Sequence, residues 1–203
     1  AESRGLKREN GLQMLVAQAK KSCEDFTGSA LPDSVIPTIT AALARGMQNI
    51  VLIGMPGCGK TSVGRALAET LHRPFLDADE ILVQQAGMSI PDIFRLEGED
   101  GFRRRETAVL AGLGKRSGCI LATGGGCVTR AENYPLLRQN GTIFCLTRAL
   151  DLLPSAGRPV SQALGAEAIY AQRKPLYERF ADHMISNDGA LSDTINEILE
   201  VLG

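Results

Sequence analysis

A glycine-rich stretch at residues 54–61 has the residue types that are needed to bind a phosphate group. It reads Gly-Met-Pro-Gly-Cys-Gly-Lys-Thr, which fits the pattern G-x-x-x-x-G-K-S/T. Glycines let backbone N–H groups close around phosphate oxygens without a Cβ in the way. Lys60 can reach the β- and γ-phosphates of a nucleotide, and the hydroxyl of Thr61 can ligate Mg²⁺.

The flanking sequence predicts the strand and the helix that such a loop requires. Residues 49–53 are apolar and β-branched, as in a buried parallel strand. Residues 62–72 carry Val63, Leu67 and Leu71 at helical spacing. The alternative is a glycine-rich turn with a chance lysine, and the ordered strand and helix on either side argue against it.

Two carboxylates come next, at the end of a second short strand that starts at residue 73. Asp77 and Asp79 are two residues apart, so in extended chain they point to opposite sides and need separate functions. One can help to hold Mg²⁺, and the other can accept a proton from an attacking hydroxyl. The alternative for Asp79 is the N-cap of the following helix, which is a common use of Asp.

Arginines that could bind an anion open a later helix, predicted over residues 102–116. Arg103 and Glu106 are three residues apart, so they share a helix face and can pair. A guanidinium held by a carboxylate points in a fixed direction, which suits a carboxylate ligand. Arg104 and Arg105 are predicted to face solvent, and the alternative for the whole run is a charged helix surface.

Three further features follow along the chain. Residues 123–126, Thr-Gly-Gly-Gly, come after a buried strand at 119–122 and would expose backbone N–H groups to a ligand. Arg158 lies in a Pro- and Gly-rich segment, 148–165, that is typical of a mobile lid and could bring a cation to the phosphates. Arg173 offers a second guanidinium for an anionic substrate.

Composition limits the functional class. The chain has 203 residues, of which 44% are hydrophobic and 22% are charged, as in an ordinary globular protein. The formal net charge of -1 indicates neither a nucleic-acid surface nor an anionic-membrane surface, and no apolar run is long enough to span a membrane. Five cysteines without a C-x-x-C pair argue against a zinc site or a disulfide framework and favour a reducing, cytoplasmic compartment.

Apolar, strand-like runs alternate with helical patterns from residue 49 to the C-terminus. This alternation predicts an α/β fold, in which a parallel five-stranded sheet is covered by helices on both faces. The expected strands cover residues 49–53, 73–77, 119–122, 142–146 and 183–186. Between them, Ser89 and Pro91 open a predicted helix, Gly98 and Gly101 bracket a predicted turn, and residues 166–180 are predicted to be helical despite Pro175. Ligands should bind at the carboxyl ends of these strands, where the polar candidates lie. Residues 1–46 are predicted to form a helical appendage without catalytic residues.

These motifs, taken together and in this order, resemble the shikimate kinase family over residues 47–203. The matching residues are Gly54 to Thr61, Asp77, Asp79, Phe102, Arg103, Glu106, Thr123 to Gly126, Arg158-Pro159, Arg173 and Tyr177. The resemblance implies a three-layer P-loop kinase fold and the ATP-dependent phosphorylation of the 3-hydroxyl of shikimate, in aromatic amino-acid biosynthesis. It also implies a monomeric kinase domain that binds ATP, Mg²⁺ and shikimate.

The resemblance implies a role for each matching residue. Lys60, Asp79 and Arg158 would be catalytic, with Arg158 closing from the lid onto the transferring phosphoryl group. Thr61 and Asp77 would hold Mg²⁺. The substrate would contact Asp79, Arg103, Gly124, Gly125, Gly126 and Arg173, with Glu106 supporting Arg103. The nucleotide would contact Gly54, Met55, Pro56, Gly57, Cys58, Gly59, Lys60, Thr61, Ser62 and Arg158.

The sequence departs from the family pattern around the lid. The segment from Thr147 to Arg158 is short, and Val160 stands where Leu is usual. The family arginine that packs on adenine has only Arg148 as a weak match, and residues 187–189 could add contacts to the adenine.

Residues 1–28 resemble the C-terminal end of a shikimate dehydrogenase. The matching residues are Arg4-Gly5, Asn10-Gly11-Leu12, Met14-Leu15-Val16, Gln18 and Phe26-Thr27-Gly28. The likeness implies that the chain was cut from a dehydrogenase–kinase fusion, with residues 1–46 as remnant and linker. Gln18, which matches a substrate contact in that family, would be a relic here. The alternative is an unrelated amphipathic helix.

Two other functions share part of this pattern. A related small-molecule kinase, acting on gluconate or a nucleotide, would share the phosphate loop. A nucleotide-binding module that regulates a fused partner would bind nucleotide without transferring phosphate. The presence of Asp79, Arg103, Arg158 and Arg173 together argues against the second alternative.

Overall fold

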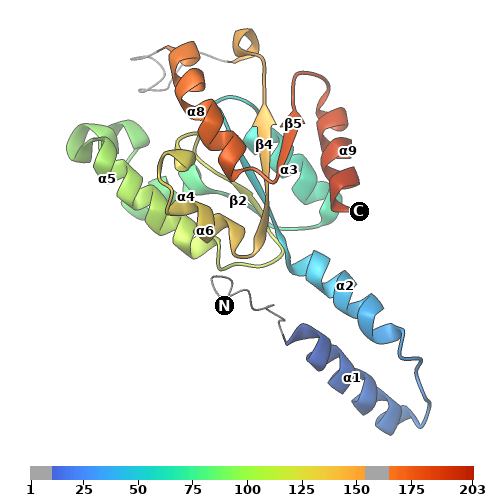
Figure 1. The fold of residues 1–203 in the computed structure, drawn as a ribbon. Helices are drawn as coiled ribbons and strands as arrows, with labels where there is room; N and C mark the ends of the chain where they lie inside the picture. The colour runs from blue at the N-terminus through green and yellow to red at the C-terminus, as the bar shows by residue number, and fades with distance from the viewer. Residues whose placement is uncertain (1–10, 154–164) are drawn as a thin grey trace. The chain divides into compact units, whose positions relative to one another are not determined.

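The chain forms two compact units, residues 1–47 and residues 48–203, in a computed structural model that describes residues 11–153 and 165–203. The first unit is a pair of helices and the second is an α/β domain (Figure 1). No helix within the described ranges has both the length and the low polarity that crossing a membrane requires.

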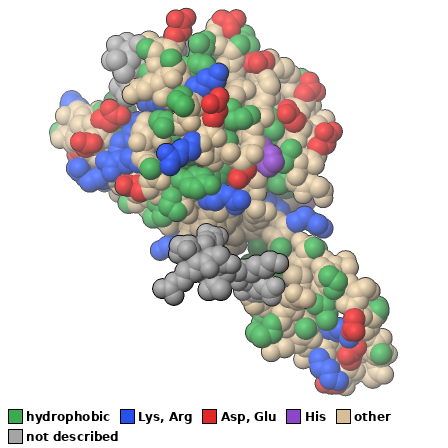
Figure 2. All heavy atoms as spheres, viewed as in Figure 1, with side chains coloured by type: hydrophobic (Ala, Val, Ile, Leu, Met, Phe, Trp, Pro, Cys, Tyr) green, Lys and Arg blue, Asp and Glu red, His purple; other side chains and the backbone are tan. Residues whose placement is uncertain are grey.

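The first unit is a helical hairpin with polar contacts at the connection between its two helices. Its helices are α1 (Leu12–Thr27) and α2 (Val35–Met47). Gly28 ends α1 in the left-handed conformation, with φ of 69°. In the connection, the carboxylate of Glu24 accepts hydrogen bonds from Lys20 and from the backbone N–H of Leu31, each at 2.8 Å. Figure 2 shows hydrophobic side chains on the visible surface of this unit, where Val16 is the buried hydrophobic residue among those described.

The second unit is built on the predicted parallel sheet. Its strands are β1 (Asn49–Gly54), β2 (Phe75–Asp77), β3 (Ile120–Ala122), β4 (Gly141–Thr147) and β5 (His183–Ser186). Their order is β2-β3-β1-β4-β5, and every neighbouring pair is parallel. The prediction of a five-stranded parallel α/β fold is therefore confirmed. β1 is buried along its whole length because it is the central strand, which explains its continuous run of apolar, β-branched residues.

Helices cover both faces of this sheet. They are α3 (Lys60–Leu71), α4 (Ala78–Ala86), α5 (Ile90–Leu113), α6 (Asn133–Arg138), α8 (Ala166–Phe180) and α9 (Leu191–Leu202), with short 3₁₀ turns at Cys127–Thr129 and Leu150–Leu152. Figure 1 shows α3 and α9 on one side of the sheet, with α6 and α8 on the other. The helix over 166–180 forms despite Pro175, as the sequence predicts.

The register of the strands brings the segments that follow β1, β2 and β3 to the same edge of the sheet. Leu52 of β1 pairs with Ala122 of β3, and Ala122 also pairs with Asp77 of β2. On the other side, Gly54 pairs with Leu146 of β4. The phosphate loop, the Asp77 turn and the glycines after β3 therefore emerge together, as expected for parallel strands.

One local prediction needs correction, and one alternative that the sequence left open is excluded. The turn expected over residues 98–101 is wrong in extent, because α5 continues through it with a kink at Gly98 alone, at φ of 69°. A glycine can take this left-handed conformation for one residue, after which the helix resumes. The N-cap of α4 is Asp77 rather than Asp79: its side chain accepts hydrogen bonds from the backbone N–H groups of Asp79 and Glu80.

We expect Asn49→Ala to destabilise the second unit by about 1–3 kcal/mol, because it leaves a buried N–H group without an acceptor. Asn49 is fully buried, and its Oδ1 accepts a hydrogen bond from the backbone N–H of Cys119 at 3.0 Å. Urea denaturation measures the effect, with Glu69→Ala on the exposed face of α3 as the control. Equal midpoints for the two variants would contradict the prediction.

Candidate active site

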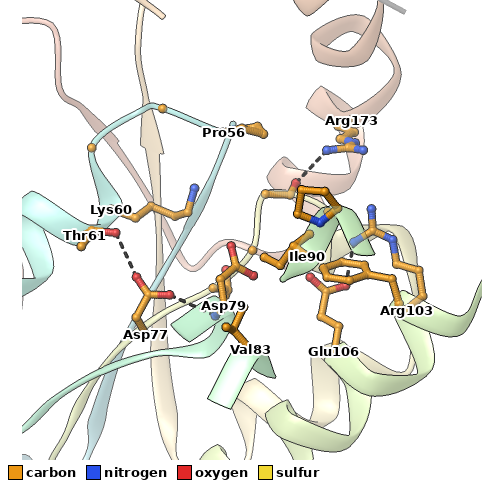
Figure 3. Close-up of a pocket in the computed structure, with 18 of the residues that line it drawn as sticks. Pro56, Lys60, Thr61, Asp77, Asp79, Val83, Ile90, Arg103, Glu106 and Arg173 are labelled. Atoms are coloured by element: carbon orange, nitrogen blue, oxygen red, sulfur yellow. Dashed lines mark hydrogen bonds and ion pairs between the residues drawn. The ribbon is translucent and has the colours of Figure 1, made fainter. Parts of the chain in front are cut away.

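One cavity lies at the carboxyl edge of the sheet, between the phosphate loop, α5 and α8. Its volume is ≈ 720 Å³, which suits a drug-sized ligand. Figure 3 shows Lys60, Thr61, Asp79, Arg103, Glu106 and Arg173 arranged around it. The lining residues include Pro56, Gly57, Gly59, Lys60, Thr61, Ser62, Asp77, Asp79, Arg103, Glu106, Gly124, Gly125, Gly126, Arg148 and Arg173.

The phosphate loop is held open by left-handed glycines and by a residue from the far end of the chain. Gly57 and Gly59 have φ of 86° and 100°, which side chains rarely adopt. A Cβ on Gly59 would lie 2.3 Å from Nδ2 of Asn187. That amide donates a hydrogen bond to the carbonyl oxygen of Cys58 at 2.7 Å, so Asn187 stabilises the conformation of the loop.

Lys60 is folded back onto its own loop. Its Nζ donates to the carbonyl oxygens of Gly54 and Met55, both at 3.0 Å, and the residue is 9% exposed. These carbonyls hold the ammonium at the cavity wall without neutralising it. A phosphate can therefore bind the Lys60 ammonium without first breaking an ion pair.

Thr61 and Asp77 are positioned to share one cation. The hydroxyl of Thr61 donates to Oδ2 of Asp77 at 3.0 Å (Figure 3). Two oxygens that ligate one octahedral Mg²⁺ in adjacent positions lie about 3 Å apart, because each Mg–O bond is about 2.1 Å. The pair therefore fits Mg²⁺ once the hydroxyl proton turns away. Within the described ranges no group of three or more His, Cys, Asp or Glu side chains could hold a metal, so phosphate and water would supply the other ligands.

Asp79 projects into the cavity from the first turn of α4 (Figure 3). Burial raises the pKa of its carboxyl from 3.8 to about 6, and the nearby charges of Asp77 and Glu106 add to the shift. Lys60 and Arg103 oppose it. Asp79 is thus a carboxylate poised closer to neutrality than an exposed Asp, which suits a proton acceptor.

Arg103 and Glu106 form a buried ion pair on α5. Nη1 of Arg103 lies 2.8 Å from Oε2 of Glu106, and the side chains are 6% and 1% exposed. Arg103 also contacts the half-exposed Glu99 at 3.2 Å. Although burial opposes the charge, the Glu106 carboxylate raises the pKa of Arg103. Burial raises the pKa of Glu106, whose second oxygen, Oε1, has no hydrogen-bond partner among the described residues.

The three glycines after β3 allow side chains from three elements to approach one another. A Cβ on Gly124 would lie 2.6 Å from Oε1 of Glu106 and 2.8 Å from Oδ1 of Asp79. One on Gly125 would clash with Pro56 at 2.6 Å, and one on Gly126 would clash with the Arg103 guanidinium. Each glycine is therefore needed because something else occupies the space of its side chain.

Arg173 reaches the same cavity from α8. Its Nη1 donates to the carbonyl oxygen of Gly125 at 3.1 Å, and the hydroxyl of Tyr177 donates to the same oxygen. Arg173 is 6% exposed, and its Nε has no hydrogen-bond partner in the part of the chain that the structure describes. Arg103 and Arg173 thus line one cavity from two helices, on either side of the Gly124–Gly126 turn.

Some predicted residues lie elsewhere or outside the described ranges. Arg158 lies outside them, so its role stays a prediction. Arg104 is exposed as expected, but Arg105 binds the Glu97 carboxylate with contacts of 2.7–3.1 Å, so facing solvent is only partly right. The side-chain amide of Asn187 supports the phosphate loop, and adenine contacts from residues 187–189 stay a prediction.

Sequence reasoning missed the apolar wall of the cavity. Val83, Ile90, Pro91 and Phe102 line it opposite the phosphate loop. These residues lie in ordinary amphipathic helices, so no sequence signal distinguishes them from core residues. It also assigned Asn187 no structural role, because the contact with the loop joins residues 129 positions apart.

Comparison with known proteins places this geometry in a family. The shikimate kinase family model matches residues 56–203. A shikimate kinase of Cupriavidus pinatubonensis is 44% identical over 149 residues, which cover 69% of this chain and 78% of the relative. One of Symbiobacterium thermophilum is 42% identical over 167 residues, which cover 76% of this chain and 96% of the relative. A solved shikimate kinase from Acinetobacter baumannii in complex with shikimate superposes with a TM-score of 0.71 at 38% identity, covering 80% of this chain and 96% of that one. The chain therefore belongs to the shikimate kinase family.

Proposed function

We propose that the chain transfers the γ-phosphoryl group of ATP to the 3-hydroxyl of shikimate. The observation that carries this proposal is that a phosphate loop, a buried carboxylate and two guanidinium groups line one cavity: Lys60, Asp79, Arg103 and Arg173. The Acinetobacter relative is solved with shikimate bound, which supports the same choice of acceptor here.

The substrate carboxylate would bind between Arg103 and Arg173. Arg103 is fixed by Glu106, and Arg173 is fixed by the Gly125 carbonyl, so each guanidinium has its direction set before substrate arrives. Such preorganised groups bind a planar carboxylate with geometric specificity. The ring hydroxyls would then point toward Asp79.

Asp79 would accept the proton of the attacking hydroxyl. In this step the substrate oxygen forms a bond with the γ-phosphorus, and the bond from that phosphorus to the β–γ bridging oxygen breaks. Lys60 and the loop N–H groups would stabilise charge on the phosphate oxygens, since phosphoryl transfer depends on positioning and charge stabilisation. Mg²⁺ held by Thr61 and Asp77 would supply further positive charge at the nucleotide.

We further infer the origin and state of the chain from its resemblances. Residues 1–46 would be the remnant and linker of a shikimate dehydrogenase, and residues 47–203 a monomeric kinase domain of the cytoplasm. The motifs in residues 1–28 support the first inference, and the free cysteines, four of them buried, support a reducing compartment. A parent transcript that starts at the codon of Ala1 would contradict the fusion, and a dimer in analytical ultracentrifugation would contradict the monomer.

A coupled assay of ADP release, with and without shikimate, tests the central proposal. We expect release to depend on shikimate and to exceed that with gluconate or a nucleoside monophosphate. Preference for gluconate would instead support the related small-molecule kinase. Tight nucleotide binding without shikimate-dependent release would support a non-catalytic module.

Asp79→Asn should nearly abolish turnover while leaving the protein folded. The acidic limb of the wild-type kcat/KM profile should fall near pH 6, since the ionised form of Asp79 accepts the proton. The raised pKa of Asp79 also affects stability. Its contribution to the stability of the folded state is complete below pH 3.8, the pKa in the unfolded chain, and is lost as the pH rises through about 6. Asp79→Asn should therefore melt no lower than wild type at pH 8. Wild-type turnover in the folded variant would remove Asp79 from the mechanism.

Arg103→Ala should lose turnover and also lose stability, because it leaves the buried Glu106 carboxylate without its cation. The double variant Arg103→Ala/Glu106→Gln should regain most of the stability but not the activity. Thermal melts and steady-state kinetics separate the two effects. Recovery of turnover in the double variant would show that Arg103 acts on the fold and not on the substrate.

Asp77→Asn should raise the KM for Mg-ATP roughly tenfold or more, because one metal ligand loses its charge. Its melting temperature should change little, since Asn also caps helices well. Thr61→Val should act in the same direction, and Thr61→Ser, which keeps the hydroxyl, serves as the control. Kinetics at several Mg²⁺ concentrations check this, and an unchanged Mg²⁺ dependence in Asp77→Asn would exclude the assigned site.

A further inference from the structure

Arg148 has a position in the cavity that neither the phosphate loop nor the substrate clamp explains. It directly follows β4, the strand that pairs with β1 along its whole length. It lines the main cavity with Pro56, Gly57 and Arg173. It also lines a small second cavity, shared with Met55, Tyr170 and Lys174. The side chain thus lies between the start of the phosphate loop and α8.

Arg148 differs in its hydrogen bonding from the other described cations that line the main cavity. Lys60 donates to two loop carbonyls, Arg103 is paired with carboxylates, and Arg173 donates to Gly125. Within the described ranges, Arg148 has neither a hydrogen bond nor an ion pair, and its buried Nε has no partner. Leaving a buried guanidinium donor unsatisfied costs stability unless a ligand supplies the acceptor.

The backbone on both sides of Arg148 is fixed. The carbonyl oxygen of Thr147 accepts from the N–H of Asn187 at 2.9 Å. The N–H of Ala149 donates to the carboxylate of Asp188 at 2.7 Å. Because Asn187 also holds the phosphate loop through Cys58, the arginine and the loop are positioned by the same residue. The backbone that carries Arg148 is therefore held in place relative to the loop.

Strand register indicates which anion Arg148 would meet. Gly54, the first residue of the phosphate loop, pairs with Leu146, so Arg148 follows β4 two residues beyond the start of the loop. The proposed carboxylate end of the cavity lies instead around Gly126, next to the Arg103 guanidinium. Arg148 therefore lies at the phosphate-loop end of the cavity, where it lines the wall with Pro56 and Gly57.

We propose that Arg148 is a catalytic residue that binds the γ-phosphoryl group of ATP from the end of β4. This inference rests on the proposed kinase function and adds a cation that is built into the sheet edge. As the bond to the bridging oxygen breaks, its guanidinium would share the charge on the γ-phosphoryl oxygens. An arginine in that position contributes on the order of 10³-fold or more to turnover in other phosphoryl-transfer enzymes.

Arg148→Met tests the proposal, because it keeps much of the side-chain length and removes the donors. We expect kcat to fall on the order of 10³-fold. The affinity for the β,γ-imido analogue of ATP should fall about tenfold, while the affinity for ADP stays that of wild type. Calorimetry measures both affinities without acceptor, so the test stands even if shikimate is not the substrate. Lys174→Ala is the matched control, since Lys174 lines only the second cavity and is exposed.

Three outcomes would overturn the proposal. Equal losses of affinity for ADP and the ATP analogue would place Arg148 on the nucleoside or the inner phosphates. A rise in the KM for shikimate alone would place it on the substrate carboxylate. Wild-type binding and turnover in a folded Arg148→Met would leave it with no role in the reaction. A failure of the kinase function itself would appear separately, as ADP release in wild type that does not depend on shikimate.

Discussion

The parallel pairing of β1 with both β3 and β4 is the constraint on which the site depends. Parallel strands end at the same edge of a sheet, so whatever follows them is brought together without further design. Here the pairs Leu52 with Ala122 and Gly54 with Leu146 set the phosphate loop beside the glycine turn on one side and Arg148 on the other. The hydrogen bonds of the sheet thus fix the relative positions of groups that are far apart along the chain.

The second requirement of the site is that side chains approach the backbone of the turn after β3 closely, and the glycines of this turn allow it. Gly126 leaves room for the Arg103 guanidinium, and Gly125 leaves room for Pro56 of the phosphate loop. The carbonyl of Gly125 then anchors Arg173 and Tyr177 of α8. Consequently, the turn after β3 contacts both the phosphate loop and the arginines of the proposed substrate clamp. A Cβ on any of its three glycines would clash with a neighbouring side chain.

The two buried carboxylates of the cavity, Glu106 and Asp79, differ in how close they lie to a cation. Glu106 is paired with Arg103, whereas Asp79 forms no ion pair with the described residues and has a pKa raised to about 6. Two carboxylates on neighbouring elements therefore have different protonation behaviour, one structural and one suited to proton transfer. The arginines of the cavity also differ from each other, because Arg103 is paired with Glu99 and Glu106, whereas the buried Nε of Arg148 has no hydrogen-bond partner in the described part of the chain.

Much of the fold could be predicted from the sequence, because its signals are local. Strand and helix periodicity, the glycine spacing of the phosphate loop and the Pro91 helix start each depend on neighbours within a few residues. The five parallel strands and most element bounds follow from these patterns, and the motif set was enough to indicate the family. The extent of the 98–101 turn was wrong for the same reason, since a single glycine kink and a true turn look alike locally.

What only the tertiary structure decided are the contacts between residues distant in sequence. Asp77 rather than Asp79 caps α4 because the chain turns there and leaves Asp79 facing the cavity. Asn187 reaches the phosphate loop, and Arg148 reaches the cavity, because β4 and β5 pair beside β1; the buried Nε of Arg148 has no partner within the described ranges. A sequence specifies residue types and spacing, but burial, charge pairing and pKa depend on distances through space, and those exist only once the sheet has formed.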